Sequence, residues 1–299
     1  LMPDEDGYPD YEAFKNAVSE RTAAFITANP EDTGVFNPRV KQFTDLVHEK
    51  GGLCGYDQAN ANGILGVARA KEAGFDLCHF NLHKTFGSPH GSNGPGCGAS
   101  GVRKGLEQFF PVPAVTFDGE NYGLNYGLPL SIGKIRSFLG NIPVVVRSYA
   151  WIAAMGADGL RKTAEISVLN NNYMTKKMCE IKGIGLAYNT DVPWHLEQTR
   201  YTCEEMFQAT GVTGSDVRRR ISDYGLQSYH ESHYPVLIPN PITLEPTETY
   251  SKADMDYYIE VFKEISEDAY QNPVVIKNAP QRCLRWTNMA GAAMRQPAP

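Results

Sequence analysis

Lys84 is the residue whose position most suggests covalent chemistry. It follows a short apolar run, residues 77–80, and precedes a glycine- and proline-rich stretch, residues 87–98. An amine at a strand end, shielded from bulk water, can become nucleophilic enough to form a Schiff base with an aldehyde cofactor. A solvated surface lysine would give the same local pattern, so Lys84 by itself leaves both interpretations open.

Asp57 is a second candidate, because it ends another apolar run 27 positions before Lys84. Pyridoxal phosphate (PLP) requires a carboxylate against its pyridine nitrogen, since protonation makes the ring an electron sink. Asn60, three positions further on, would bring a short amide toward the phenolic oxygen of such a cofactor. An aspartate that only caps a turn or helix is the alternative for Asp57.

His90 lies in the glycine-rich stretch, where it could contact substrate or phosphate, or simply fix the loop. The glycines would allow close backbone approach to a ligand. Residues 87–98 do not form a P-loop, because no G-x-x-x-x-G-K-[ST] occurs. They do not form a dinucleotide fingerprint either, since no G-x-G-x-x-G joins a strand to a helix.

A sheet is predicted to position these residues. Short apolar runs at 22–28, 53–56 and 77–80 predict strands. Between them, apolar residues recur at helical spacing, with Asn37 as the expected N-cap and Gly51 as the stop. Strands that alternate with helices predict an α/β fold with a mostly parallel sheet and helices on both faces.

The position of the candidate residues in this sheet suggests a shared site. Asp57 and Lys84 both stand just past predicted strand ends. Ligands of parallel sheets bind beyond the carboxyl ends of the strands. We therefore expect the two side chains to face one ligand.

The rest of the chain does not continue the alternation of predicted strands and helices. Residues 99–103 predict a returning strand and residues 111–133 an irregular segment. Beyond residue 140 the sequence predicts a C-terminal α+β small domain, and we place the domains at 1–145 and 146–299. Its expected elements are a buried helix at 144–155, an amphipathic helix at 160–181 with Leu160, Ala164, Val168, Leu169 and Tyr173 on one stripe, strands at 234–238 and 242–244, and a helix after a Ser251–Asp254 capping box.

Composition excludes several classes of protein. The 299 residues are 42% hydrophobic, which argues against wholesale disorder, and 28 basic against 34 acidic residues give a net charge of −6. An acidic balance argues against a nucleic-acid partner, and no apolar run is long enough for a membrane span. The six cysteines form no C-x-x-C pair, so no metal site is predicted and we expect reduced thiols in a cytoplasmic location.

The chain resembles the glycine cleavage system P-protein, glycine decarboxylase. The matching motifs occur in the same order over about residues 20–280. Their spacing is most similar to that of subunit 2 of the two-subunit bacterial form. It rests on D-Q-A-N-A-N (57–62), N-L-H-K-T-F (81–86), P-H-G-x-x-G-P-G (89–96), S-I-G-K-I-R (131–136), G-N with V-R-S-Y-A (140–150), L-N-N-N-Y (169–173) and L-E-P-T-E-T (244–249).

The resemblance implies a fold type I PLP-dependent enzyme of the aspartate aminotransferase type. Lys84 would hold pyridoxal 5'-phosphate as a covalent aldimine, and Asp57 would pair with the pyridinium nitrogen. Asn60 and Asn81 would contribute to cofactor binding. The list of expected catalytic residues is Lys84, His83 and His90.

The implied reaction is the oxidative decarboxylation of glycine, with transfer of the aminomethyl group to the lipoyl arm of H-protein. That makes the enzyme a glycine dehydrogenase (aminomethyl-transferring), an oxidoreductase. The implied partners are glycine, lipoylated H-protein and P-protein subunit 1 in a heterotetramer. Arg147 or Arg136 would supply a cation for the substrate carboxylate or the lipoyl protein, with structural ion pairing as the alternative.

Some features depart from the family pattern. Ser92, Asn93 and Cys97 interrupt a more continuous glycine run, and Gln281 stands where a histidine is expected. The chain begins Leu1-Met2, without the family's phosphate loop and ring-stacking residue. We therefore expect an N-terminally truncated chain that is inactive alone.

Two other interpretations remain open. The lysine, aspartate and sheet pattern would also suit another fold type I enzyme, such as a cysteine desulfurase-like lyase or a serine hydroxymethyltransferase-like aldolase. A non-catalytic chain that only binds a partner subunit is the third. The P-H-G-x-x-G-P-G and E-P-T-E segments favour the glycine decarboxylase family.

Overall fold

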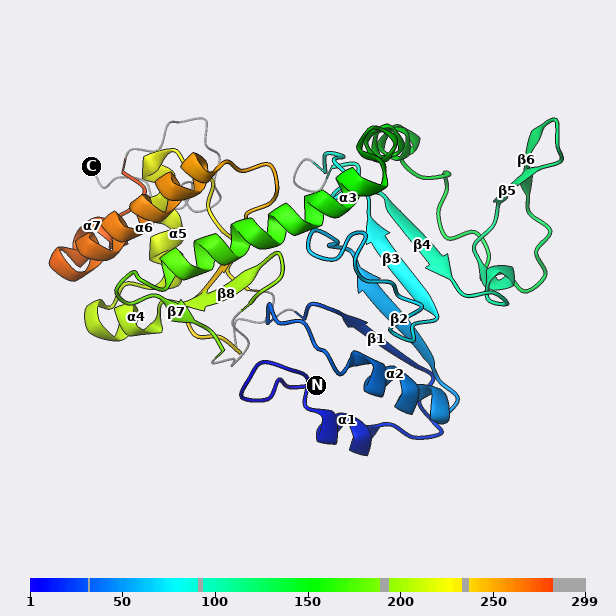
Figure 1. The fold of residues 1–299 in the computed structure, drawn as a ribbon, viewed down its shortest axis with the longest axis horizontal. Coiled ribbons are helices and arrows are strands. Elements are labelled where there is room, and N and C mark those ends of the chain that lie inside the picture. Colours follow the sequence, from blue (N-terminus) through cyan, green and yellow to red (C-terminus); the bar gives the residue numbers. More distant parts are fainter. Residues whose placement is uncertain (32, 91–93, 189–193, 233–236, 282–299) are drawn as a thin grey trace. The chain divides into compact units, whose positions relative to one another are not determined.

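The structure is a computed structural model that describes residues 1–281 except 32, 91–93, 189–193 and 233–236 (Figure 1). The chain forms two compact units. The sheet unit comprises residues 11–29 and 38–162, and the C-terminal unit comprises residues 1–10, 30–37 and 163 onward. The domain limits expected from the sequence, 1–145 and 146–299, stay a prediction.

A four-stranded sheet is the centre of the sheet unit (Figure 1). Its strands are β1 (Ala24–Ala28), β2 (Leu53–Gln58), β3 (Leu77–Asn81) and β4 (Gly98–Val102), in that spatial order. β1, β2 and β3 are parallel, and β4 returns antiparallel to β3. The expected mostly parallel sheet is therefore confirmed, and all four strands lie where short apolar runs or the returning segment predicted them.

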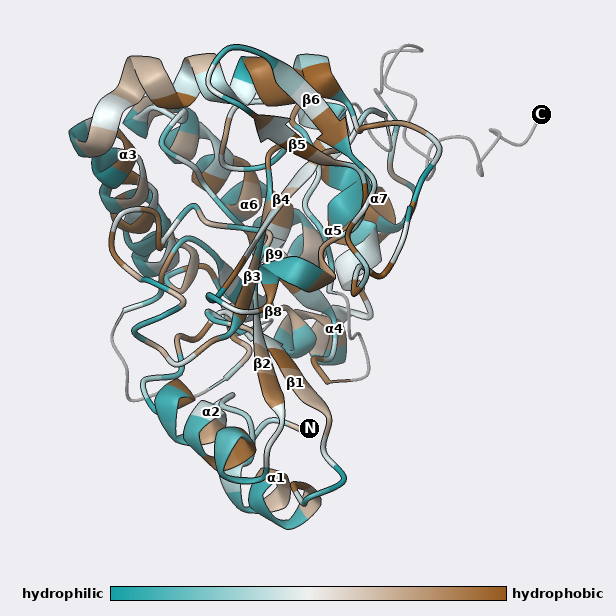
Figure 2. Cartoon of the chain, turned by 90° about the vertical axis from the view of Figure 1, so that its right-hand side faces the viewer, coloured by the Kyte–Doolittle hydropathy of each residue, from teal (hydrophilic) through white to brown (hydrophobic). Residues whose placement is uncertain are grey.

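Two short helices pack on one face of this sheet. They are α1 (Tyr11–Ala17) and α2 (Val40–Glu49), and their apolar side meets the sheet through the rings of Phe14, Phe43 and Phe25. Figure 2 shows the matching alternation of brown and teal turns along α2. The opposite face of the sheet carries Asp57 and Ile26, whose exposed fraction is 74%.

The start of α2 differs from the prediction. Arg39 is the N-cap residue, and no side chain caps this end of the helix. Asn37, the expected cap, is buried at 1% exposure, and residues 38 and 39 form a turn between it and the first helical residue. The helix therefore begins two residues later than its Asn-Pro sequence suggests.

The segment predicted to be irregular contains a β-hairpin instead. β5 (Ala114–Phe117) pairs antiparallel with β6 (Tyr122–Asn125) after a short 3₁₀ turn at Glu107–Phe109. The Asp118 carboxylate closes the loop by accepting backbone N–H bonds from Glu120 and Asn121 at 2.9 and 2.8 Å. The period-two alternation of apolar and polar residues in these short strands was the signal for the hairpin.

One long helix, α3 (Ile142–Met178), replaces the two helices expected at 144–155 and 160–181. It is kinked at Gly156, which adopts φ 62°. The first half is not buried as expected, because Val146 and Tyr149 are 59% and 73% exposed. Val144 is buried with Leu82 and Phe86, whereas Val145, Val146 and Tyr149 lie on the surface.

The C-terminal unit is the expected α+β region, with an antiparallel sheet of β7 (Gly185–Leu186), β8 (Thr199–Thr202) and β9 (Pro241–Leu244). The helices are α4 (Glu204–Thr210), α5 (Gly214–Ile221), α6 (Lys252–Gln271) and α7 (Pro273–Lys277), with a 3₁₀ turn at Ser222–Tyr224. Its core includes Met178, Tyr201, Met206, Ile221, Ile242, Phe262 and Ile265.

Several sequence predictions can be compared in this unit. The Ser251–Asp254 capping box and the strand at 242–244 are confirmed. The strand expected at 234–238 falls largely on residues outside the described ones, and residues 237 and 238 are not in a strand. The predicted helical stripe is wrong at Leu169, which is 67% exposed, because Asn170 and Asn171 occupy the buried side of α3. No helix among the described residues is long and apolar enough to cross a membrane.

Candidate active site

Lys84 lies in a turn that follows the carboxyl end of β3. Its backbone N–H donates to the Asn81 carbonyl at 3.2 Å, and its own carbonyl accepts from Gly87 N–H at 3.4 Å. The Lys84 side chain is exposed, and its amine has no hydrogen bond or ion pair within the described part of the chain. The amine is thus held on an ordered turn while remaining free to react.

Asp57 lies on the neighbouring parallel strand and is exposed. It is inside β2, one residue from the strand end, rather than just past it. Its Oδ1 accepts the Ala59 backbone N–H at 2.9 Å, and Oδ2 has no hydrogen-bond partner among the described residues. β2 and β3 are parallel, so Asp57 and the turn of Lys84 lie at the same edge of the sheet.

The side chains of Asn60 and Asn81 make hydrogen-bond contacts next to the turns around these two residues. The Asn60 amide oxygen accepts the Asn62 N–H at 3.2 Å, and the Asn81 amide oxygen lies 2.8 Å from Nε2 of His79. The two turns are joined by a hydrogen bond from Ala61 N–H to the Thr85 hydroxyl at 3.0 Å. Both expected amides therefore lie beside the lysine and aspartate.

The rings of His83 and His90 are in contact, with centroids 4.2 Å apart and their planes tilted by 55°. Nδ1 of His83 is 3.1 Å from both the backbone N and O of Cys97, which anchors the ring to the glycine-rich segment. Partial burial, assisted by the neighbouring His90 and Lys84, lowers the pKa of His83. Nδ1 of His90 is buried without a hydrogen-bond partner within residues 1–281 as described.

His79 is a site residue that the sequence analysis did not single out. It pairs in register with Asp57, so both side chains project from the same face of the sheet. Gly98 makes room for the ring, because a Cβ there would lie 2.4 Å from Cε1 of His79. The signal was available in the period-two alternation of His79 with Asn81 along β3, but the pairing with Asp57 required the register.

A pocket of about 340 Å³ adjoins His79 on the sheet unit. Its polar lining comes from His79, Ser100 and Arg136, and its apolar lining includes Pro111, Ile135 and Phe138. Arg136 lies 5.7 Å from the ring of Phe138, measured from the guanidinium carbon to the centroid. Arg147 does not line this pocket; its Nε donates to the Gly87 carbonyl at 3.1 Å.

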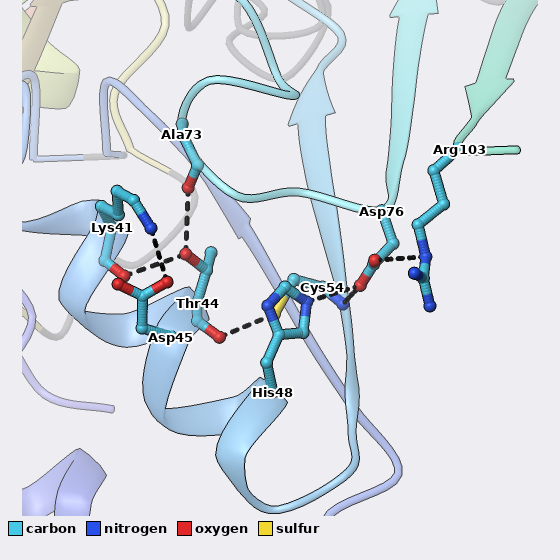
Figure 3. Close-up of polar contacts among 8 residues, drawn as sticks. All are labelled: Lys41, Thr44, Asp45, His48, Cys54, Ala73, Asp76 and Arg103. Atoms are coloured by element: carbon cyan, nitrogen blue, oxygen red, sulfur yellow. Dashed lines mark hydrogen bonds and ion pairs between the residues drawn. The ribbon is translucent and has the colours of Figure 1, made fainter.

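A separate cluster has residue types that can ligate metals (Figure 3). Nε2 of His48 and the backbone N of Cys54 lie 2.8 and 2.7 Å from the same carboxylate oxygen of Asp76. Nε of Arg103 forms an ion pair with the other carboxylate oxygen of Asp76 at 2.7 Å. Burial and the adjacent carboxylate raise the pKa of the Cys54 thiol to about 12. A guanidinium at the carboxylate and a protonated thiol favour a structural network over a metal site.

The arrangement of the candidate site defines a class of protein. Lys84 follows β3 and Asp57 lies on the neighbouring parallel strand β2, which is the arrangement expected for the fold type I class at the carboxyl edge of a mostly parallel sheet. Solved structures support this fold. The chain superposes on a glycine decarboxylase (P-protein) of the glycine cleavage system in inhibitor-bound form with a TM-score of 0.70, at 18% identity, covering 88% of this chain and 58% of that one.

A cysteine desulfurase from Thermococcus onnurineus has a TM-score of 0.66 at 16% identity, with 89% of this chain and 65% of that one covered. At such identities the likeness establishes the fold alone. The expected fold type I architecture is confirmed.

Sequence comparison shows which proteins the chain is similar to. Residues 163–282 match the family of the glycine dehydrogenase C-terminal domain. A probable glycine dehydrogenase (decarboxylating) subunit 2 from Pyrococcus abyssi is 43% identical over 282 residues, which is 94% of this chain and 55% of that protein. The protein of that name from Thermotoga maritima is 40% identical, covering 92% and 57%.

Over more than nine tenths of its length the chain is similar to glycine dehydrogenase (decarboxylating) subunit 2 proteins, which agrees with the resemblance of its motifs. It spans about half the length of the curated relatives that it matches.

Proposed function

We propose that this chain carries the PLP-binding lysine of a glycine decarboxylase, an oxidoreductase of the glycine cleavage system. Glycine would lose CO₂, and its aminomethyl group would pass to the oxidised lipoyl arm of an H-protein, whose disulfide is reduced. The observation that carries the proposal is the pair Asp57 and Lys84 at one edge of the sheet, in a chain 43% identical to a relative of that name.

The residues present fit PLP. The Lys84 amine and Oδ2 of Asp57 have no partners among the described residues, and both come from the carboxyl edge of adjacent strands. The buried Nδ1 atom of His90 also lacks a partner there, which leaves a polar atom for a ligand to satisfy. These are the groups that a covalently held, ring-protonated cofactor would use.

When bound, PLP would supply an electron sink for the electron pair that remains after loss of CO₂. The Lys84 amine would hold the cofactor covalently. The Asp57 carboxylate would keep the proton on the ring nitrogen, because an ionised acid at that position stabilises the positive charge. His79, on the same face as Asp57, would lie along the same side of the site.

The two histidines would act as hydrogen-bonding groups. The lowered pKa of His83 keeps its imidazole uncharged at neutral pH, and Cys97 fixes the orientation of the ring. His90, whose ring contacts that of His83, would present a ring nitrogen to the cofactor or substrate. Asn60 and Asn81 would maintain the two turns and contribute amide groups toward the cofactor.

The proposed partners are glycine, a lipoylated H-protein and a subunit 1 that completes a heterotetramer. The names of the relatives, which contain "subunit 2", support a partner subunit. A cytoplasmic location is proposed with the same assignment. No observation on this chain favours the cysteine desulfurase-like or aldolase-like alternatives over the decarboxylase.

Borohydride reduction of the chain with saturating PLP, followed by peptide mapping, tests the cofactor assignment. A phosphopyridoxyl group is expected on Lys84, because the residue is exposed and its amine is unpaired among the described residues. Lys84→Arg should remove the label, whereas Lys104→Arg, at another exposed lysine of the sheet unit, should leave it. Preferential label on a different lysine would contradict the assignment.

The reaction itself is tested by isotope exchange. A protein with the full length of the relatives, mixed with lipoylated H-protein, should exchange labelled bicarbonate with the carboxyl group of glycine. A PLP-loaded enzyme that shows no exchange would overturn the decarboxylase assignment while leaving the cofactor assignment intact.

A further inference from the structure

The first three turns of α3 are hydrogen-bonded to the segment that contains Lys84. The Asn141 amide, just before the helix, donates to the Gly96 carbonyl, and Arg147 Nε donates to the Gly87 carbonyl at 3.1 Å. Trp151 packs edge-on against Phe86, with centroids 6.2 Å apart. These contacts hold the chain that follows Lys84, from Phe86 to the glycine-rich stretch.

Two buried serines add a second set of contacts. Ser88 is 5% exposed and Ser148 is 2% exposed, and their hydroxyl oxygens lie 2.8 Å apart. Ser88 also donates to the Val144 carbonyl at 3.1 Å, and Ser148 lies 3.4 Å from the Leu82 carbonyl. Buried hydroxyls with satisfied hydrogen bonds fix geometry, because any movement would leave them unpaired.

We propose that this part of α3 is a clamp that positions Lys84, and that Arg147 is a positioning residue for covalent attachment of PLP rather than a binding group for the substrate carboxylate. The inference rests on the proposed function. Arg147 would act on Lys84 through two hydrogen bonds in sequence. Its guanidinium donates to the Gly87 carbonyl, and the Gly87 N–H donates to the Lys84 carbonyl at 3.4 Å.

The local backbone shows why such a clamp is required. Gly87 has φ 70°, and a Cβ there would lie 3.2 Å from the Trp151 ring, so the turn is pressed closely against α3. A left-handed glycine is free to leave this conformation when nothing restrains it. Arg147 supplies a charge-assisted bond to the carbonyl of that glycine, which restrains the turn and with it the lysine.

The test compares two substitutions of Arg147 with a control. Arg147→Met removes the donor and the charge, whereas Arg147→Lys keeps the charge but not the Nε–H group at that place. Arg69→Met removes an equally exposed cation of the sheet unit whose partner is Glu72. Each chain is reduced with borohydride and PLP, and the label on Lys84 is measured relative to the label on Lys71 and Lys104.

Both Arg147 variants should lower the preference for Lys84 about fivefold, the equilibrium effect of losing one such hydrogen bond. They should also shift the pH at which the visible band of bound PLP titrates, a readout that general destabilisation does not move in a folded chain. Arg69→Met should match the wild type. Ser148→Ala provides a second, independent variant and should act in the same direction.

The outcomes separate the two proposals. Full labelling of Lys84 and an unchanged titration in Arg147→Met, or rescue by Arg147→Lys, would overturn the clamp while leaving the cofactor assignment standing. Absence of preferential Lys84 labelling in the wild-type chain would overturn the cofactor assignment, and the clamp with it.

Discussion

At the residue scale, the candidate chemistry depends on two exposed side chains whose reactive atoms have no partner among the described residues. Lys84 and Asp57 could be selected from the sequence because their types, and their positions at the ends of apolar runs, are local properties. His79 could not be selected with the same ease. Its relevance comes from the parallel register with Asp57, which places both side chains on one face of the sheet.

Asp57→Asn tests the ring-nitrogen role. An amide cannot hold a proton on the pyridine nitrogen by charge, so PLP should bind at least about tenfold more weakly, equivalent to about 1.4 kcal/mol. The measurement is the PLP concentration that half-saturates borohydride labelling of Lys84. Asp118→Asn, in the loop of the β5–β6 hairpin, is the control; equal losses in both variants would contradict the assignment.

Glu197 gives a pH-dependent prediction in the C-terminal unit. It is 1% exposed, its Oε2 has no partner in the described part of the chain, and burial together with Glu245 raises its pKa to about 8. The folded state therefore keeps a proton that the unfolded state releases near the ordinary glutamate pKa. Stability contributed by this proton is complete below about pH 4.5 and is lost as pH rises toward about 8.

Glu197→Gln should remove this dependence. Between about pH 5 and 8, the variant should gain stability relative to wild type by about 1.4 kcal/mol per pH unit. Denaturant unfolding at a series of pH values measures the difference. Glu180→Gln, at an exposed glutamate of the same unit, should not gain stability relative to wild type as pH rises. If the stability difference between Glu197→Gln and wild type did not change with pH, Glu197 would not be a buried neutral acid.

At the element scale, side chains of α3 donate hydrogen bonds to the backbone of neighbouring segments. Its three consecutive asparagines bind different backbone segments: Asn170 binds the Thr247 carbonyl, Asn171 binds the Leu196 carbonyl and Asn172 binds the His195 carbonyl. The sequence predicted an apolar stripe here, and it was wrong at Leu169. Polar residues can occupy a buried helix face when every amide finds a backbone partner.

Asn171→Ala should destabilise the C-terminal unit by about 1–3 kcal/mol, because the part-buried Leu196 carbonyl and the buried Thr199 hydroxyl lose their donor. Thermal or denaturant unfolding measures the loss. Asn121→Ala, at an exposed asparagine in the hairpin loop, is expected to change stability far less. A loss below that of the control would mean that the amide is not essential to this packing.

At the scale of the whole molecule, the chain comprises two compact units with separate hydrophobic clusters. The candidate site and the α3 clamp belong to the sheet unit, while most of the large buried side chains belong to the C-terminal unit. We therefore expect packing changes in one unit to act locally. The two units should be distinguishable by their amide hydrogen exchange.

Ile265→Val tests this division. The fully buried Ile265 lies on α6, and loss of one methylene should cost about 1 kcal/mol. Hydrogen exchange should increase in α6 and β8 and stay unchanged across residues 81–90. Val47→Ala, in the sheet unit, should show the opposite distribution; equal increases in both units would contradict separate stability.

The sequence by itself determined the parts of this protein that depend on local order: the strand runs, the two capping residues of α6, the lysine and aspartate near strand ends, and the motifs that resemble the P-protein family. The tertiary structure decided what depends on distant neighbours. It gave the β5–β6 hairpin, the register that brings His79 beside Asp57, the bond from Arg147 to the lysine turn, and the burial of Glu197. The physical reason is that periodicity records which side of an element is apolar, whereas pairing, burial and hydrogen-bond partners depend on residues tens of positions away.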